Sequence, residues 1–133
     1  MKKIVTASIL LISLYCLISC TNKSKDKLIV GKWSYEKFEA GPKTPEEGAI
    51  RIETNNKGRL VVFDSDKKYV SLGSQGDTTE TGSYELTGEG KFMVMLRNGS
   101  TKAGDTIKVV ELTDKTFKIQ SPKDDVVTFK RVQ

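Results

Sequence analysis

The stretch TETGSYELTGEGKFMVML, residues 79–96, decides the fold of this chain. Two runs rich in threonine, aromatic and aliphatic residues are joined there by Gly88-Glu89-Gly90. Glycine adopts the positive φ angles of tight turns without steric penalty, so a short connection can reverse an extended chain. The stretch therefore predicts a β-hairpin with strands at 79–87 and 91–96.

The same pattern recurs from residue 28 onward, where runs of Val, Ile, Phe, Tyr and Thr are separated by Gly, Asn, Asp and Pro. Such spacing is typical of a β-sandwich or a β-barrel, and no long stretch has a helical period. Connections of hairpin length favour a barrel, because closure removes the sheet edges. We predict an all-β fold, a small up-and-down antiparallel β-barrel of about 8–9 strands, near residues 30–38, 49–54, 59–64, 68–73, 79–87, 91–96, 105–112, 115–121 and 125–132.

The longest gap between predicted strands, residues 39–48, is rich in glycine and proline. Proline is well tolerated at the first position of a helix, and threonine is a good N-cap. We therefore expect one helical turn at residues 44–47, with Thr44 as N-cap and Pro45 at the first helical position.

Alternation of apolar and polar residues predicts which side chains point into the barrel. Two strands, residues 60–63 and 92–96, are apolar on both faces, so their second face requires cover from a loop, a helix or a partner. Met93 and Met95 are expected on that second face, either under the chain's own loop or as a partner surface. The expected inward residues are Phe92, Val94, Leu96, Ile107, Val109, Phe117, Ile119, Val127 and Phe129.

The first residues have the composition of an export signal. Lys2 and Lys3 give a positive start, residues 4–22 carry no charge, and residues 9–18 are mostly aliphatic. This order predicts a signal peptide over residues 1–19 that is cleaved. The alternative is an uncleaved membrane helix, but the apolar part is shorter than the ~20 residues that a spanning helix needs.

Leu17-Ile18-Ser19-Cys20 resembles the lipobox of bacterial lipoproteins. The resemblance implies cleavage between Ser19 and Cys20 and attachment of fatty acids such as palmitate to Cys20. Two or three acyl chains hold a protein on a membrane far more firmly than one. Thr21, where an Asp would favour retention at the inner membrane, implies the outer membrane of a bacterial cell envelope, on either its periplasmic or its surface face. We expect residues 20–27 to be the lipidated cysteine and a flexible tether, followed by the barrel domain at 28–133.

A second resemblance lies in the barrel domain. Gly31-Lys32-Trp33 resembles the Gly-x-Trp signature of lipocalins. The run from Phe63-Asp64 to Tyr69, followed by Gly82-Ser83-Tyr84-Glu85-Leu86, is similar to lipocalin-like domains of bacterial lipoproteins. The resemblance spans residues 28–132 and implies a ligand-binding barrel.

In lipocalins the tryptophan plugs one end of the barrel, and a basic residue on the last strand stacks on it. The resemblance therefore implies a structural plug made by Gly31, Trp33 and Arg131. The chain is shorter than typical lipocalins and lacks their disulfide, which speaks against a large ligand cavity. Tyr69, Tyr84, Met93 and Met95 are the candidates for a ligand or partner surface.

The amino-acid composition excludes several kinds of functional site in the folded part. The chain of 133 residues has a net charge of +5, and no run of basic residues indicates nucleic-acid binding. Histidine is absent, and no cysteine follows Cys20, so an internal disulfide in the mature domain is excluded. Without these residues and without a convincing acid–base pair, we expect no catalytic site, no metal site and no cofactor.

Two hypotheses for the function remain. In the first, the anchored barrel holds a small apolar or amphipathic ligand. In the second, it has no small-molecule ligand and docks on an envelope protein, as an adaptor or an enzyme inhibitor. An apolar cavity would favour the first hypothesis, and an exposed apolar patch would favour the second.

Overall fold

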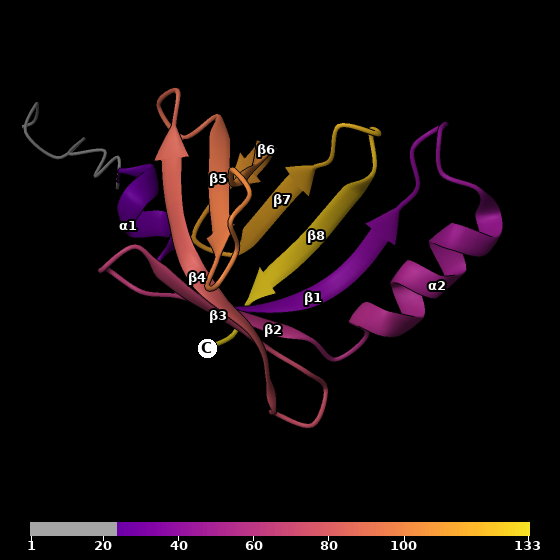
Figure 1. The fold of residues 1–133 in the computed structure, drawn as a ribbon, viewed down its shortest axis with the longest axis horizontal. Coiled ribbons are helices and arrows are strands. Elements are labelled where there is room, and N and C mark those ends of the chain that lie inside the picture. Colours follow the sequence, from indigo (N-terminus) through magenta and orange to yellow (C-terminus); the bar gives the residue numbers. More distant parts are fainter. Residues whose placement is uncertain (1–23) are drawn as a thin grey trace, which may run out of the picture.

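The computed structural model describes residues 24–133, which form a closed antiparallel barrel of eight strands (Figure 1). Strands that follow each other in the chain are neighbours in the barrel, and the last strand pairs with the first. The predicted all-β up-and-down barrel is confirmed. Within residues 24–133 no helix is both long enough and apolar enough to span a membrane. The strands are β1 Gly31–Glu39, β2 Leu60–Phe63, β3 Lys68–Leu72, β4 Thr78–Thr87, β5 Phe92–Arg97, β6 Asp105–Leu112, β7 Thr116–Gln120 and β8 Val126–Arg131.

The two ends of the barrel carry different helices (Figure 1). A short helix, α1 (Lys25–Ile29), precedes β1 and packs where β1 begins. We call this the α1 end. A longer helix, α2 (Glu46–Asn56), lies in the connection that leaves the far end of β1, and we call that the α2 end. Because the strands alternate in direction, the turns 64–67, 88–91 and 113–115 lie at the α1 end, and 73–77, 98–104 and 121–125 lie at the α2 end.

The hydrophobic core lies in the half of the barrel near α1. Most of its members lie near the end of their strand that is closer to α1. The predicted inward residues on three strands agree with this core, since Phe117 is buried and Val109, Ile119 and Phe129 pack against it. The buried members are Ile29, Trp33, Phe63, Tyr69, Tyr84, Met93, Leu112 and Phe117.

The strand predicted at residues 49–54 is wrong, because this segment belongs to α2. Ile50 and Ile52 alternate with polar residues, as in a strand. Because α2 contains no buried residue, it has no apolar face with the helical period that would identify it as a helix. Glu46 and Glu47 in the first turn suit the positive end of the helix dipole. The turn expected at 44–47 therefore continues for 11 residues, and the barrel has eight strands.

The expected start of this helix is also corrected. Pro45 occupies the N-cap position, one residue later than predicted for the cap. Thr44 does not cap the helix but donates its hydroxyl to Asp125 Oδ1 at 2.5 Å. The same carboxylate oxygen accepts the backbone N–H of Gly41 at 2.9 Å. Asp125 thus fastens the loop before α2 to the start of β8, and these hydrogen bonds hold the pKa of its carboxyl below the usual range.

The predicted facing of β5 is inverted. Met93 is fully buried and Met95 packs against the core, whereas Phe92 and Leu96 are 42% and 40% exposed. The strand is apolar on both faces, so alternation alone could not choose between them. The register decides, because Met93 lies opposite Leu86 on β4 and Ile107 on β6. Met93 and Met95 therefore face the interior of the barrel.

The structure also shortens the predicted tether of residues 20–27, whose last three residues belong to α1. Ile29 is fully buried, the ammonium group of Lys25 donates to the carbonyl oxygen of Leu112 at 2.9 Å, and Asp26 pairs with Lys67. These contacts fix α1 to the barrel. The predicted signal peptide at 1–19, the cleavage site and Cys20 lie outside the described residues.

Candidate functional site

Trp33 forms the plug of the α1 end. Its side chain is fully buried, and its indole N–H donates to the carbonyl oxygen of Ile29 at 2.8 Å. The guanidinium carbon of Arg131 lies 4.3 Å from the centre of the indole ring. This is the cation–π pair that the resemblance to lipocalins implied, and it joins the first strand to the last.

The guanidinium of Arg131 also binds three carbonyl oxygens. It donates to Val30 at 2.9 Å, to Asp114 at 2.7 Å and to Leu28. Gly31 makes room for it: a Cβ at this position would lie 2.3 Å from a guanidinium nitrogen, and its φ of 138° disfavours other residues. The Gly31, Trp33 and Arg131 group is therefore a structural closure of the barrel, with its polar atoms already occupied.

Of the four candidates for a ligand or partner surface, three belong to the buried core, namely Tyr69, Tyr84 and Met93. Met93 is fully buried, and Tyr84 is 3% exposed. The Tyr84 hydroxyl donates to the carbonyl oxygen of Asp64 at 2.7 Å, and burial raises its pKa to about 12. Neither Tyr84 nor Met93 reaches a surface that a ligand could touch without displacing the core.

Tyr69, which is only 2% exposed, and Met95 line a pocket at the α2 end. The pocket has a volume of about 390 Å³. Tyr69, Met95 and Ile107 line it together with several charged residues. The charged lining residues are Glu80, Arg97, Lys102 and Asp105.

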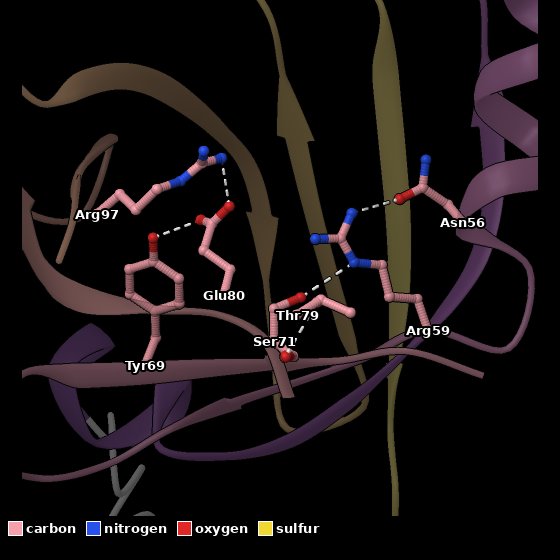
Figure 2. A network of polar contacts seen from close by, with 7 residues as sticks. All are labelled: Asn56, Arg59, Tyr69, Ser71, Thr79, Glu80 and Arg97. Atoms are coloured by element: carbon pink, nitrogen blue, oxygen red, sulfur yellow. Dashed lines mark hydrogen bonds and ion pairs between the residues drawn. The ribbon is translucent and has the colours of Figure 1, made fainter. Parts of the chain in front are cut away.

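Tyr69 and Glu80 connect the core to this pocket (Figure 2). Gly82 lies opposite Tyr69 on the neighbouring strand, and a Cβ there would lie 2.6 Å from the Tyr69 ring, so glycine lets the ring lie across β4. The Tyr69 hydroxyl donates to Glu80 Oε1 at 2.5 Å, and Arg97 pairs with the other oxygen. Burial raises the pKa of Tyr69 above its ordinary value, and the hydrogen bond to Glu80 is the second largest cause.

Arg59 comes just before β2, and its side chain contacts Ser71 on β3. Its Nε donates to Ser71 Oγ, and its Nη1 donates to Asn56 Oδ1, both at 3.0 Å (Figure 2). Ser71 is 3% exposed and lies opposite Glu80, so both face the barrel interior. The α2 end thus brings together Arg59, Ser71, Tyr69, Glu80 and Arg97 from four consecutive segments.

Sequence reasoning identified Tyr69 and Met95 but missed Arg59, Glu80 and Arg97. The sequence pattern does contain a sign of these residues, because side chains two residues apart on a strand point to the same face. Arg59 therefore shares a face with Val61 and Phe63, and Glu80 shares one with Gly82 and Tyr84. Charged residues at inward positions of a strand are unusual in a small core. A pattern of apolar residues alone does not identify these charged positions.

Two further surface features are present. A groove of about 800 Å³ lies at the α1 end and includes Lys27, Lys115, Lys130 and Arg131. On the outer face of β5 and β6, the apolar side chains of Phe92, Leu96 and Val110 are 42%, 40% and 50% exposed. Within residues 24–133 no group of three or more His, Cys, Asp or Glu side chains is placed to hold a metal ion.

Comparison with known structures gives the same fold. The chain is similar to a lipocalin-like protein from Bacteroides uniformis, with 15% identity, a TM-score of 0.59, and coverage of 79% of this chain and 99% of that one. A protein from Bacteroides eggerthii matches with 14% identity and a TM-score of 0.59, over 78% of this chain and 99% of that one.

A third structure, a DUF4847 family protein from Bacteroides vulgatus, has 11% identity and a TM-score of 0.54, and covers 80% of this chain and 95% of that one. No family model matches the sequence, and no curated protein matches it. At these identities the likeness concerns the fold, a lipocalin-like eight-stranded barrel.

Proposed function

We propose that this chain is a lipid-anchored protein of the bacterial cell envelope whose lipocalin-like barrel binds a small amphipathic molecule at the α2 end. One observation carries the binding proposal. The pocket at this end is lined by Tyr69, Met95 and Ile107 together with the charged pair Glu80 and Arg97. Small-molecule sites combine apolar side chains with a few placed polar groups.

The volume and position of the pocket suit a small ligand. Its ~390 Å³ falls in the lower part of the range of ligand sites, roughly 300–1,000 Å³. The apolar part of a ligand would lie on Met95 and Ile107, and its polar part would meet the rim. Since Trp33 and Arg131 block the α1 end, entry is expected from the α2 end.

The anchoring proposal rests on the lipobox resemblance of Leu17-Ile18-Ser19-Cys20. It is supported by the position of the fold, which begins at α1, five residues after Cys20. A short connection of this kind would hold the barrel next to the membrane.

The binding proposal is tested with protein purified from its own envelope. The Cys20→Ala form, which cannot be acylated at this position, is compared by native mass spectrometry with versions that also carry Met95→Gln or Phe92→Gln. Both added changes lie on β5, but Met95 lines the pocket, whereas Phe92 is 42% exposed and does not line it. We expect a retained small molecule in the Cys20→Ala protein and with Phe92→Gln, and its loss with Met95→Gln. A folded protein that retains nothing would contradict the proposal.

The anchoring proposal is tested by fractionating cells. Cys20→Ala is expected to release the protein from membranes and to prevent labelling with palmitate, whereas Cys16→Ala is expected to change neither. Membrane association of a cleaved Cys20→Ala protein would contradict it.

The second candidate function, docking on an envelope protein, is favoured by the exposed apolar residues on β5 and β6. Phe92→Ser with Val110→Ser would remove most of this patch without touching the pocket. Loss of a co-purifying protein in this variant, with no small molecule in the wild type, would favour docking over ligand binding.

A further inference from the structure

The groove of about 800 Å³ at the α1 end carries more positive than negative charge. It lies between the last residues of α1, the turn 113–115 and the end of β8. Each of these three segments contributes basic side chains, and among the residues 24–133 that line the groove the one acid is Asp114. The basic lining residues are Lys27, Lys115, Lys130 and Arg131.

Three of these four cations have no carboxylate partner in the described part of the chain. Lys130 pairs with Glu36 on β1. The ion pairs formed by residues 24–133 do not include Lys27, Lys115 or Arg131. The guanidinium of Arg131 donates to three carbonyl oxygens, which are neutral, so its charge is not cancelled. The groove therefore has an excess of positive charge.

Leu28 and Val30 add apolar surface to the same groove. Both are partly buried and pack against the core, so the groove is built on fixed side chains. The apolar stems of lysines such as Lys27 and Lys115 can lie along such a surface while their ammonium groups reach a polar layer. Basic residues combined with apolar ones are typical of surfaces that bind the interface of an anionic membrane.

The position of α1 brings this groove close to the proposed lipid. α1 follows its N-cap Ser24, and Lys27 lies three residues after Ser24, which is ~4.5 Å along the helix axis. Cys20 lies at most ~14 Å from Ser24 along an extended chain. A lipid on Cys20 would thus hold the groove next to the head groups of the bilayer.

We propose that the groove at the α1 end docks on the phosphate groups of anionic phospholipids, and that Lys27 and Lys115 are its main contacts. The inference rests on the proposed anchoring through Cys20 and adds a second, charge-dependent contact between the folded barrel and the membrane. A lipid on a short connection leaves the barrel free to rotate, whereas a docked groove fixes its orientation. Each lysine close to an anionic membrane surface raises the affinity about fivefold.

The test uses the chain from residue 20 onward with Cys20→Ser, so that no attached lipid contributes to binding. This form keeps every strand pairing that closes the barrel and the contacts that fix α1. Co-sedimentation measures its binding to vesicles of phosphatidylcholine alone and to vesicles that contain about one third phosphatidylglycerol. At ~0.1 M salt we expect binding to the anionic vesicles to be about tenfold tighter or more, and ~1 M salt should abolish the difference.

Two pairs of substitutions assign the effect to the groove. Lys27→Gln with Lys115→Gln is expected to weaken binding to the anionic vesicles about 20-fold. Lys43→Gln with Lys123→Gln removes the same charge from exposed positions at the α2 end and is the matched control. The control is expected to change binding less than about twofold, because a docked α1 end holds these positions beyond the Debye length of ~10 Å. Thermal melts establish that each variant is folded.

The outcomes separate this inference from the proposed anchoring. Equal binding to both kinds of vesicle, equal weakening by the two pairs of substitutions, or no binding to anionic vesicles would each overturn docking of the groove. Palmitate labelling at Cys20 would still establish the anchor in those cases. Displacement by inorganic phosphate at constant ionic strength would also overturn docking, because the groove would then take free anions. Charge-dependent binding without palmitate labelling would overturn the anchor alone.

Discussion

At the scale of single residues, Arg131 is the most connected side chain of the barrel. It stacks on Trp33, donates to three carbonyl oxygens and occupies the space that Gly31 leaves. A cation–π contact contributes about 0.5–2 kcal/mol, and a hydrogen bond to a charged group about 1.5–3 kcal/mol. The hydrogen bonds therefore outweigh the stacking, and they tie the loop before β1, the β6–β7 turn and β8 together.

We predict that Arg131→Ala lowers the free energy of unfolding by about 2–4 kcal/mol, because three carbonyl groups lose their donor. Urea denaturation followed by Trp33 fluorescence measures the loss of stability. The emission of the folded variant should also shift to the red, because water reaches the indole. Lys130→Ala is the control, since its exposed ion pair with Glu36 is worth less than about 1 kcal/mol. Equal stability losses in the two variants would contradict a closing role for Arg131.

At the scale of elements, α2 fills a place where the barrel wall is incomplete. β1 pairs with β2 only from Gly31 to Ser34, and its second half has no strand on that side. Glu53 of α2 supplies the missing acceptor, because its carboxylate accepts the backbone N–H of Phe38 at 2.9 Å and the hydroxyl of Tyr35. Since α2 buries none of its residues, these polar contacts hold much of the helix in place.

We expect Glu53→Ala to loosen α2 without unfolding the barrel. The amide of Phe38 and the amides of α2 should exchange with deuterium faster, and stability should fall by about 0.5–1.5 kcal/mol, because the lost hydrogen bonds are exposed or only partly buried. Glu47→Ala, on the exposed first turn of the same helix, serves as the control and should change stability by less than about 1 kcal/mol. Identical exchange in both variants would show that other contacts hold α2.

At the scale of the whole molecule, the position of α1 sets how an anchored barrel would face the membrane. Three residues lie between Cys20 and Ser24, and the four Cα–Cα steps between them span at most ~14 Å. α1 is fixed to the barrel by Ile29 and Lys25, whereas the extended β1 alone carries the chain ~30 Å toward the α2 end. With the proposed lipid on Cys20, the α1 end would lie near the bilayer and the pocket would face away.

This orientation is testable because the sequence contains no thiol after Cys20. Asp66→Cys lies in an exposed turn at the α1 end, and Gln75→Cys lies in an exposed turn at the α2 end. Each is labelled with a fluorophore in the acylated protein on vesicles that contain brominated phospholipid. We expect stronger quenching at position 66, and equal or reversed quenching would contradict the orientation.

The sequence by itself determined the fold class and the regions of the eight strands, although the same pattern also predicted a strand at 49–54 that belongs to α2. The closure of the α1 end was implied by the resemblance to lipocalins. Strand periodicity and turn glycines are local properties, so residues 79–96 can be identified as a hairpin without knowing their neighbours. The pair Trp33 and Arg131 followed from the lipocalin resemblance and from the closure of the barrel, which places the last strand beside the first.

Only the tertiary structure decided three further features. The facing of β5 depended on register, because a strand that is apolar on both faces has no preferred side in its own sequence. α2 depended on the open edge of β1, which turned an apparent strand into a helix held by Glu53. The polar contacts of Arg59 with Ser71 and of Glu80 with Arg97 depended on the pairing of successive strands, since contacts between residues far apart in the chain are set by the sheet and not by local sequence.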